Sequence, residues 1–511
     1  MTSLTERYAD RIKGQLSCLD RVIIMGTLPG ACHAQGMTAL LYARQIRIFD
    51  YASFAKPLAE QIRDNAERLA AQAGIEIDYI RKANFRKEQR IQELLRQRGV
   101  QPGLVHIFSV LESCTTYKPW HDKRTGRTFL KPDSGKCLHY YFYFIDPELG
   151  LCYLRVPTYC PFRLQFYFNG HNWLKTELDH RGIACELIDN VLISCDDWPM
   201  AQHIIDGFDV GALHRLLDHC AFLYCPAAAS LDIDYHWSLM QAEYAHDIVF
   251  KSSADLAPLY ESITRTAIHA VKVDQVATFL SRKLTGNYQG EAGGSFNTRI
   301  EGTCIKHHMG RAASIKMYDK LGRVLRIETT VNDVSFFKHH RTVEHRDGTS
   351  SFKLADLPKS IHSLAVLMKL MGDSNRRYLA FIGELADEGP GLRAARKLAE
   401  KARDPEQDRA VRGFNVLQEA DHELFCAIAR GEFAISGMTN RRLRQVLKDK
   451  TGPQLSRLLR ALRIHGLIKK IGRTYKYYLT ELGRRVTIAS LKLRNMLIIP
   501  ALAQPLGTHK S

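Results

Sequence analysis

The sequence predicts an α/β (α+β) fold built from two mixed α/β units, a helical connector and a separate C-terminal domain. Three observations lead to this prediction. The chain has 511 residues, which is too long for one ordinary hydrophobic core. Short apolar runs with strand periodicity alternate with helical spacing as far as about residue 357. A mainly helical stretch follows, and a basic segment with a different pattern begins near residue 414.

The composition is that of a soluble globular protein, with 45% hydrophobic and 25% charged residues. The chain has no run of about 18 apolar residues and starts with a polar segment, so neither a membrane span nor a secretory signal is expected. The twelve cysteines are spaced singly without a Cys-x-x-Cys pair, which argues against a zinc site and for reduced thiols. These features predict a cytoplasmic protein that does not interact with membranes.

The formal net charge is +18 at pH 7. A basic surface of this size attracts polyanions, and nucleic acid is the commonest polyanion in a cytoplasm. The charge therefore favours a nucleic-acid-binding function, although a protein that is merely basic would have the same value.

The first α/β unit is expected to cover residues 1–195, and two helices in residues 196–231 are expected to form a connector. Near the start, the strand Arg21–Met25 leads into a turn that contains Gly26 and Gly30. Two glycines at this spacing can cradle a phosphate, but no Lys-Ser/Thr pair follows them. A plain turn is therefore favoured, and no nucleotide cofactor is indicated.

Aromatic and cationic side chains are interleaved between residues 117 and 131, on what the sequence predicts to be an exposed loop. Cations there can neutralise phosphates while an aromatic ring stacks on a base. The nucleic-acid-binding residues predicted in this loop are Lys118, Trp120, Arg124 and Arg127. A basic hairpin tip with packed aromatic residues is the alternative structure, and RNA is the alternative ligand.

The second α/β unit, residues 232–357, contains a charged hairpin made of Ser314–Tyr318 and Val324–Thr330. Residues 319–323 are predicted to connect the two strands. If Met317 is paired with Leu325, the apolar side chains of both strands lie on one face. The other face then carries four polar side chains, Lys316, Tyr318, Arg326 and Glu328.

This polar face predicts chemistry on a phosphodiester. Glu301, Asp319 and Glu328, with Asp234 or Glu243, can hold a divalent metal such as Mg²⁺ or Mn²⁺. The full set of predicted catalytic residues is Glu301, Lys316, Tyr318, Asp319, Arg326 and Glu328. A cross-strand ion network on a non-catalytic nucleic-acid-binding sheet explains the same charges.

Two resemblances offer other chemistries for this hairpin. Lys316-Met-Tyr-Asp-Lys320, followed by Leu325-Arg-Ile-Glu328, resembles the replication proteins of small phages and plasmids, which implies that Tyr318 is a nucleophile. Those proteins also carry a His-hydrophobic-His metal motif, which this sequence lacks. Glu301-Gly-Thr-Cys-Ile-Lys306 is similar to a late motif of polynucleotide ligases, but their Lys-x-Asp-Gly nucleophile motif is missing.

Residues 358–413 are predicted to be a helical linker region, with residues 403–413 as a linker. The C-terminal domain, residues 414–511, has three helical segments and then two short strands, which is the order of a winged helix-turn-helix. Its segment Leu455–Val486 resembles the recognition helix and wing of bacterial MarR-like regulators, and the resemblance extends over about residues 418–496. It implies that a DNA major groove is contacted by Gln454, Ser456, Arg457, Arg460 and Arg463, and that the wing is flanked by Lys469, Lys470, Arg473 and Lys476.

Between Thr439 and Arg485, fourteen Lys and Arg residues are opposed only by Asp449 and Glu481. This charge favours duplex DNA as the partner, independently of the resemblance. A homodimer is compatible with such a domain. The leading hypothesis is a protein that recognises and processes DNA in a mobile or replicative element. The alternative is a non-catalytic transcriptional regulator or RNA-binding factor.

Overall fold

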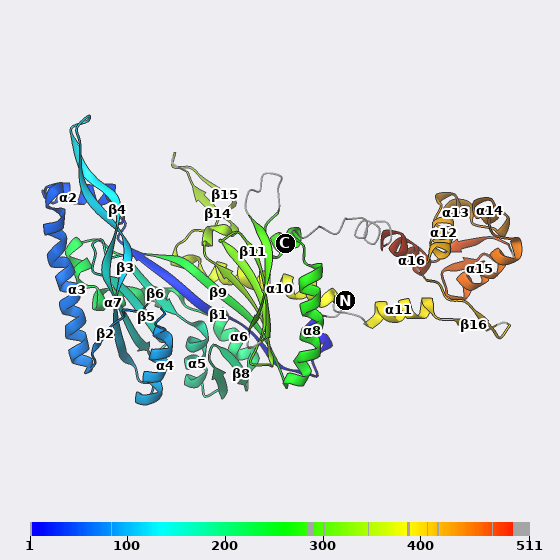
Figure 1. Cartoon of the computed structure of the whole chain (residues 1–511), viewed down its shortest axis with the longest axis horizontal. Coiled ribbons are helices and arrows are strands. Elements are labelled where there is room, and N and C mark those ends of the chain that lie inside the picture. Colours follow the sequence, from blue (N-terminus) through cyan, green and yellow to red (C-terminus); the bar gives the residue numbers. More distant parts are fainter. Residues whose placement is uncertain are drawn as a thin grey trace, which may run out of the picture. The chain divides into compact units, whose positions relative to one another are not determined.

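The computed structural model describes residues 3–82, 84–283, 291–299, 302–345, 347–385, 389–405, 407–415, 418–472 and 474–493 (Figure 1). The chain divides into two compact units, residues 1–386 and 387–511. Both units contain helices and strands, so the predicted mixed α/β class is confirmed. Within the described ranges, no helix is both long enough and apolar enough to cross a membrane.

One mixed sheet organises the first unit and has 11 strands among the described residues. Its order is β10-β11-β12-β13-β9-β1-β6-β5-β4-β3-β2, and every neighbouring pair is antiparallel except β2 and β3. The strands are β1 (Ile12–Thr27), β2 (Ile77–Tyr79), β3 (Gly103–Asp122), β4 (Arg127–Asp146), β5 (Gly150–Pro157), β6 (Leu164–Phe168), β9 (His236–Phe250), β10 (Ala292–Arg299), β11 (Gly302–Met309), β12 (Ala313–Lys320) and β13 (Val324–Val331).

The long strand β1 joins two distant parts of the chain in this sheet. It pairs with β6 on one side and with β9 on the other. The two α/β units predicted for residues 1–195 and 232–357 are therefore halves of one sheet, and the prediction of separate units needs this correction. Sequence periodicity shows that a strand is buried on both faces, but it does not show which distant strand pairs with it.

Helices cover one face of the sheet, which we call the apolar face. There Ile248, Ile315 and Ile327 pack against α8 (Ser253–Ala270) and α10 (Leu364–Leu385). Apart from two helices that lie on the opposite face, the other helices described in this unit are α1 (Leu4–Arg7), α2 (Ala34–Ala43), α3 (Tyr51–Ala73), α6 (Trp198–Asp206), α7 (Val210–Tyr224) and α9 (Val273–Phe279), with 3-10 turns η1 (Ile48–Asp50), η2 (Pro226–Leu231), η3 (Val334–Phe336) and η4 (Ile361–Ser363). The two helices predicted in the connector are α6 and α7.

The opposite face carries Glu243 on β9 and Glu328 on β13, and we call it the polar face. Its two ends are covered. Helix α4 (Lys87–Arg98) packs on aromatic residues of β3, β4 and β5. At the other end lie helix α5 (Gly170–His180) and the hairpin of β7 (Cys185–Ile188) and β8 (Val191–Cys195). Between these covers the side chains of Arg21 and Met240 are exposed.

The charged hairpin of β12 and β13 has the predicted faces but a different register. Met317 pairs with Ile327, and Lys316 lies directly opposite Glu328. Asp319 and Lys320 belong to β12 and not to the connection, which is the short turn at residues 321–323. Leu321 and Gly322 have φ values of 57° and 72°, so the chain reverses in fewer residues than the sequence suggested.

Two hairpins extend beyond the ladders of the large sheet. The first is the part of β3 and β4 between residues 111 and 138, where the two strands pair only with each other. We call it the β3–β4 arm, and it projects from the unit (Figure 1). The exposed loop predicted for residues 117–131 is therefore mostly strand, with its turn at residues 123–126. This matches the alternative of a basic hairpin tip. The second hairpin consists of β14 (Lys338–Glu344) and β15 (Ser350–Asp356).

The second unit has its own hydrophobic core, to which Phe425, Leu443, Leu455 and Leu462 contribute. Its elements are α11 (Gly389–Ala399), β16 (Ala402–Asp404), β17 (Arg409–Val411), α12 (Glu419–Ile428), α13 (Gly431–Ser436), α14 (Asn440–Val446), α15 (Gly452–Ile464), β18 (Ile468–Lys470), β19 (Tyr477–Leu479) and α16 (Glu481–Lys492). The linker predicted at residues 403–413 instead contains the hairpin of β16 and β17. This hairpin packs against α15, and the polar composition of the segment did not indicate that contact.

Candidate functional site

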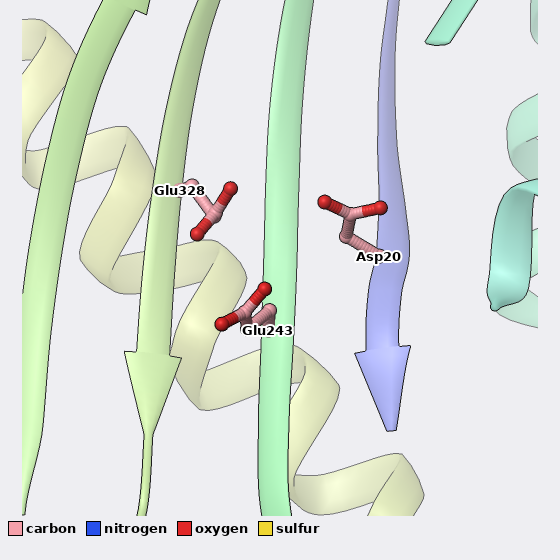
Figure 2. Close-up of side chains that lie close together, drawn as sticks. All are labelled: Asp20, Glu243 and Glu328. Atoms are coloured by element: carbon pink, nitrogen blue, oxygen red, sulfur yellow. The ribbon is translucent and has the colours of Figure 1, made fainter. Parts of the chain in front are cut away.

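Three carboxylates meet on the polar face of the sheet. Asp20, Glu243 and Glu328 come from the neighbouring strands β1, β9 and β13, and their ligand oxygens all lie within 4.8 Å of one another. Figure 2 shows the three side chains close together, with a helix passing behind the strands. We call this group the carboxylate cluster.

Strand alternation and one irregularity bring these side chains to the same face. Glu328 lies opposite Ala245, two residues from Glu243, so both glutamates point to the polar face. In β1 the register shifts between Leu19 and Arg21, which leaves Asp20 as an extra residue. Such a bulge redirects a side chain, and here it places Asp20 beside Glu243.

Asp20 is buried and is held by several donors. Asn169 Nδ2 donates to it at 3.0 Å, Asn190 Nδ2 at 2.5 Å and the Arg326 guanidinium at 3.2 Å. Burial favours the neutral acid, but the nearby His171 and Arg326 outweigh it and hold the pKa of Asp20 well below its usual range. Asp20 is therefore a fixed negative charge.

Arg326 is fully buried and lies two residues from Glu328 along β13, on the same face of the sheet as the cluster. Its guanidinium donates two hydrogen bonds of 2.6 Å to Asp247, one to Asp20 and one of 2.6 Å to the carbonyl oxygen of Asn190. Every one of these acceptors belongs to the protein. Arg326, predicted as a catalytic residue, is thus placed to position two carboxylates rather than to contact a substrate.

His171 lies between two of the buried acids. Its ring nitrogens are 3.6 Å from Asp20 and 3.7 Å from Asp247, and its side chain is 1% exposed. Burial opposes a charge on the ring, yet the two carboxylates raise the pKa of His171 above its usual value. In its protonated form the His171 ring adds a positive charge beside Arg326 at this end of the cluster.

Glu328 is also neutralised by its neighbours. Lys316 Nζ donates to it at 2.6 Å and the Tyr318 hydroxyl at 2.8 Å. Burial, together with the charge of Glu328, raises the pKa of Tyr318 well above its usual value. Because the phenolate is disfavoured, the geometry does not support Tyr318 as a ready nucleophile. It supports a role for Lys316 and Tyr318 in orienting Glu328.

Glu243 is the carboxylate with the weakest compensation. Its hydrogen-bond donor is Gln241 at 3.4 Å, and Lys316 Nζ is 4.0 Å away. Burial and the negative charge of Glu328 raise the pKa of Glu243 to about 7. Near neutral pH this side chain exchanges a proton easily, and a cation bound beside it would replace that proton.

Part of this cluster is predicted by the sequence. Strand alternation puts Glu328, Lys316 and Tyr318 on one face, and Glu243 is one of the two optional metal ligands. Asp319 lies one residue from Tyr318 and so faces the apolar side, away from Glu328, which separates these two predicted metal ligands. Glu301 lies outside the described residues. The other optional ligand, Asp234, precedes β9 and is not in the cluster.

Asp20 was missed altogether. One feature of the sequence could have indicated it: Asp20 is an acidic residue in the largely apolar segment Leu19–Met25. A carboxylate that is buried there needs partners that offset the cost of its desolvation. That feature marks a residue with an unusual environment. It does not identify Glu243 and Glu328, which follow more than 200 residues later in the chain.

The predicted binding residues of the β3–β4 arm are mostly accessible. Trp120 is 43% exposed, and Lys131 Nζ lies 3.7 Å from the centre of its ring. Lys118 forms an ion pair of 3.1 Å with Asp133, whereas Arg124 and Arg127 are exposed. The arm therefore presents a basic surface with one half-exposed indole.

In the second unit, the predicted DNA-binding residues differ in what their side chains contact. Arg460 donates to the buried Asp404 of β16, so its guanidinium is engaged within the unit. Arg463 is half-buried on the same helix, and Gln454 caps α15 by accepting from Thr451. The remaining predicted residues that the structure describes are exposed: Ser456, Arg457, Lys469, Lys470 and Lys476. Arg473 lies outside the described residues.

Comparison with known proteins gives little further information. No protein-family model and no curated protein matches the chain. One similar solved structure is the crystal structure of the di-domain ARO/CYC BexL from the BE-7585A biosynthetic pathway, at 9% identity and a TM-score of 0.14, over 59% of this chain and 95% of that chain. A similarity this low carries no functional argument.

Replacement of Arg326 tests its structural role. Arg326→Met leaves Asp247 and Asp20 buried without their guanidinium, so it should lower the free energy of unfolding by about 3–5 kcal/mol. Urea denaturation followed by tryptophan fluorescence measures this loss. The control is Arg323→Met in the nearby turn, which should change stability by about 0.5 kcal/mol or less. Equal losses in the two variants would contradict the assignment.

Metal binding should depend on pH through Glu243. Because its pKa is about 7, Glu243 holds a proton at lower pH that a cation must displace. The apparent affinity for Mn²⁺ should therefore rise by up to about tenfold per pH unit below pH 7 and level off above it. Calorimetric titration at several pH values measures the affinity. A wild-type profile that stays flat through pH 7 would mean that Glu243 is not a ligand.

Proposed function

We propose that this protein recognises duplex DNA through its second unit and catalyses metal-dependent phosphodiester cleavage or strand transfer at the carboxylate cluster. The observation that carries the proposal is the convergence of Asp20, Glu243 and Glu328 within 4.8 Å. Glu243 in particular is weakly compensated, because Lys316 Nζ lies 4.0 Å from it and donates instead to Glu328. A protein with both activities suits a mobile or replicative element.

The donor atoms favour a particular class of metal. All three side chains offer carboxylate oxygens, which are hard ligands suited to Mg²⁺ and Mn²⁺. Such an ion polarises a phosphodiester and lowers the pKa of a bound water. Lys316 and Tyr318 would keep Glu328 oriented, and Arg326 would keep Asp20 oriented. No zinc ligand set and no nucleotide cofactor enters this proposal.

The order of elements in the second unit supports DNA recognition. Helices α12, α14 and α15 are followed by β18 and β19, and Met438 forms an additional bridge to Tyr477. This is the arrangement expected of a winged helix, with α15 as the recognition helix. The exposed Arg457 on α15 and the exposed Lys469 and Lys476 near the hairpin fit contacts with DNA phosphates.

A non-catalytic nucleic-acid-binding role is the second candidate. It is favoured by the pairing of Glu328 with Lys316 and of Asp20 with Arg326, because both carboxylates are already neutralised. In that case the cluster would be a structural ion network and Glu243 would stay protonated near neutral pH. The two candidates differ in whether the cluster binds a divalent cation.

Cleavage assays distinguish the candidates. Plasmid and single-stranded DNA should be nicked or cut by the wild-type protein with Mg²⁺ or Mn²⁺, and Glu243→Gln should lower the rate by at least about 100-fold because a metal ligand is lost. Asp319→Asn is the matched control, since it removes a carboxylate from the opposite face of the same hairpin. Absence of wild-type cleavage with either metal would leave the non-catalytic candidate.

Two arginines of α15 test the recognition helix. Arg457→Ala should weaken duplex DNA binding by about fivefold and reduce the salt slope by about 0.9, because one exposed cation is removed. Arg460→Ala should instead lower the stability of the second unit by about 1–3 kcal/mol, because Asp404 is left buried without its partner. Fluorescence anisotropy and thermal denaturation measure the two effects. Equal DNA affinity of Arg457→Ala and the wild type would exclude this helix face from the interface.

A further inference from the structure

The polar face continues past the carboxylate cluster in both directions. On one side, Lys316 lies opposite Glu328 and Lys306 of β11 lies opposite Lys316. On the other side, Arg21 of β1 lies opposite Glu243. Cross-strand partners share a face, so Lys306 and Arg21 flank the cluster on the same surface. From β11 to β1 the distance is about 19 Å, which is four strand spacings.

Among the residues that the structure describes, no ion pair joins either flanking cation to a carboxylate, and Arg21 acts on Glu243 only through its charge. Lys306 and Lys316 are like charges directly opposite each other, which destabilises a sheet unless an anion lies nearby. Glu328 neutralises Lys316, but neither Lys306 nor Arg21 forms an ion pair with a carboxylate in the described ranges. Lys306 is half-buried and Arg21 is exposed. The surface therefore has two positions suited to an anionic ligand.

Beyond Arg21 the polar face becomes aromatic and ends in a hollow. The Arg21 guanidinium is 5.9 Å from the ring centre of Tyr167, which stacks on Tyr153 with centroids 5.0 Å apart. The hollow has a volume of about 220 Å³ and is lined by Met25, Ser113, His139, Arg155, Arg163 and Gln165, among others. This is smaller than the pockets of about 300–1,000 Å³ that hold drug-sized ligands, so one base or one phosphate is the unit that fits.

The cluster itself is recessed. The side chains of Asp20, Glu243 and Glu328 are only 6%, 16% and 3% exposed. A duplex is stiff and carries its phosphates on a convex surface, so it cannot bring a phosphate down to carboxylates that lie in a sheet. A single strand is flexible, so it can follow a cationic path and bring one phosphate down to carboxylates that lie in a sheet.

We propose that the polar face binds a single-stranded nucleic acid that crosses β11, β12, β13, β9 and β1 and reaches the hollow beside β5. Lys306 and Arg21 bind phosphates on either side of the carboxylate cluster. The position of the reacting phosphate rests on the proposed function, but the binding path does not. The path makes single-stranded nucleic acid the substrate of the site, while duplex DNA is the ligand of the second unit.

The test compares two double variants of the 511-residue chain, each of which loses one lysine and one arginine. Arg21→Gln with Lys306→Gln removes the flanking cations. Lys369→Gln with Arg376→Gln is the control, because both residues line a separate cavity of about 880 Å³ on the apolar face. Binding of a labelled oligothymidylate of about 16 nucleotides is measured by fluorescence anisotropy in EDTA over a range of salt concentrations.

The Arg21 and Lys306 double variant should bind the oligonucleotide about tenfold more weakly, with a salt slope reduced by about 1.4, since two single-strand phosphate contacts are lost. The control variant should keep both the affinity and the slope. Lys306→Arg keeps the charge and should bind like the wild type. Unchanged affinity of the double variant, or an equal loss in the control or on a duplex of the same length, would overturn the path.

A Mn²⁺ titration separates this inference from the proposed function. The Arg21 and Lys306 double variant should still bind Mn²⁺, because in the described residues no hydrogen bond or ion pair joins either side chain to a cluster carboxylate. Weak oligonucleotide binding with retained Mn²⁺ binding supports the path. Loss of Mn²⁺ binding in this variant would mean that the substitutions disturb the cluster, and the path would then be rejected.

Discussion

The buried guanidinium of Arg326 is the interaction on which the centre of the sheet depends. It lies between Asp247 and Asp20, and it links β13 to β9 and β1. Burying ionised groups is costly unless they are paired and hydrogen-bonded, and each donor of this guanidinium that the structure describes has an acceptor. This pairing lets a sheet with an apolar core on its other face carry several acids at its centre. It also holds Asp20 in the ionised form beside Glu243.

The same interactions explain why Glu243 differs from the other two carboxylates of the cluster in its pKa. Arg326 and His171 lie beside Asp20, and Lys316 donates to Glu328, so each of these two carboxylates has a basic side chain next to it. Glu243 lies between them with Lys316 Nζ 4.0 Å away, and burial together with the charge of Glu328 raises its pKa to about 7. A site with one weakly compensated carboxylate is suited to a divalent cation or to a proton. The flanking Lys306 and Arg21 then extend this local charge pattern into a surface that fits a polyanion.

The sequence predicted the contacts of the site between residues that are close in the chain, and it missed those between residues that are far apart. Lys316, Tyr318 and Glu328 lie on two strands joined by a short turn, and alternation alone puts them on one face. The predicted register is wrong by two residues, because Asp319 and Lys320 belong to β12 and not to the turn. Asp319 is therefore no partner of Glu328, since a shift of one position along a strand places a side chain on the opposite face.

By itself, the sequence determined the helices and strands with strong periodicity, the polar and apolar faces of the charged hairpin, and the basic character of the C-terminal segment. These properties depend on residues that are neighbours in the chain. Only the tertiary structure decided that β1 joins two predicted units into one sheet and that Asp20 and Glu243 stand beside Glu328. It likewise decided that Arg460 turns toward Asp404. Backbone hydrogen bonds between distant strands and ion pairs between distant side chains set these arrangements, and periodicity along the chain contains no record of either.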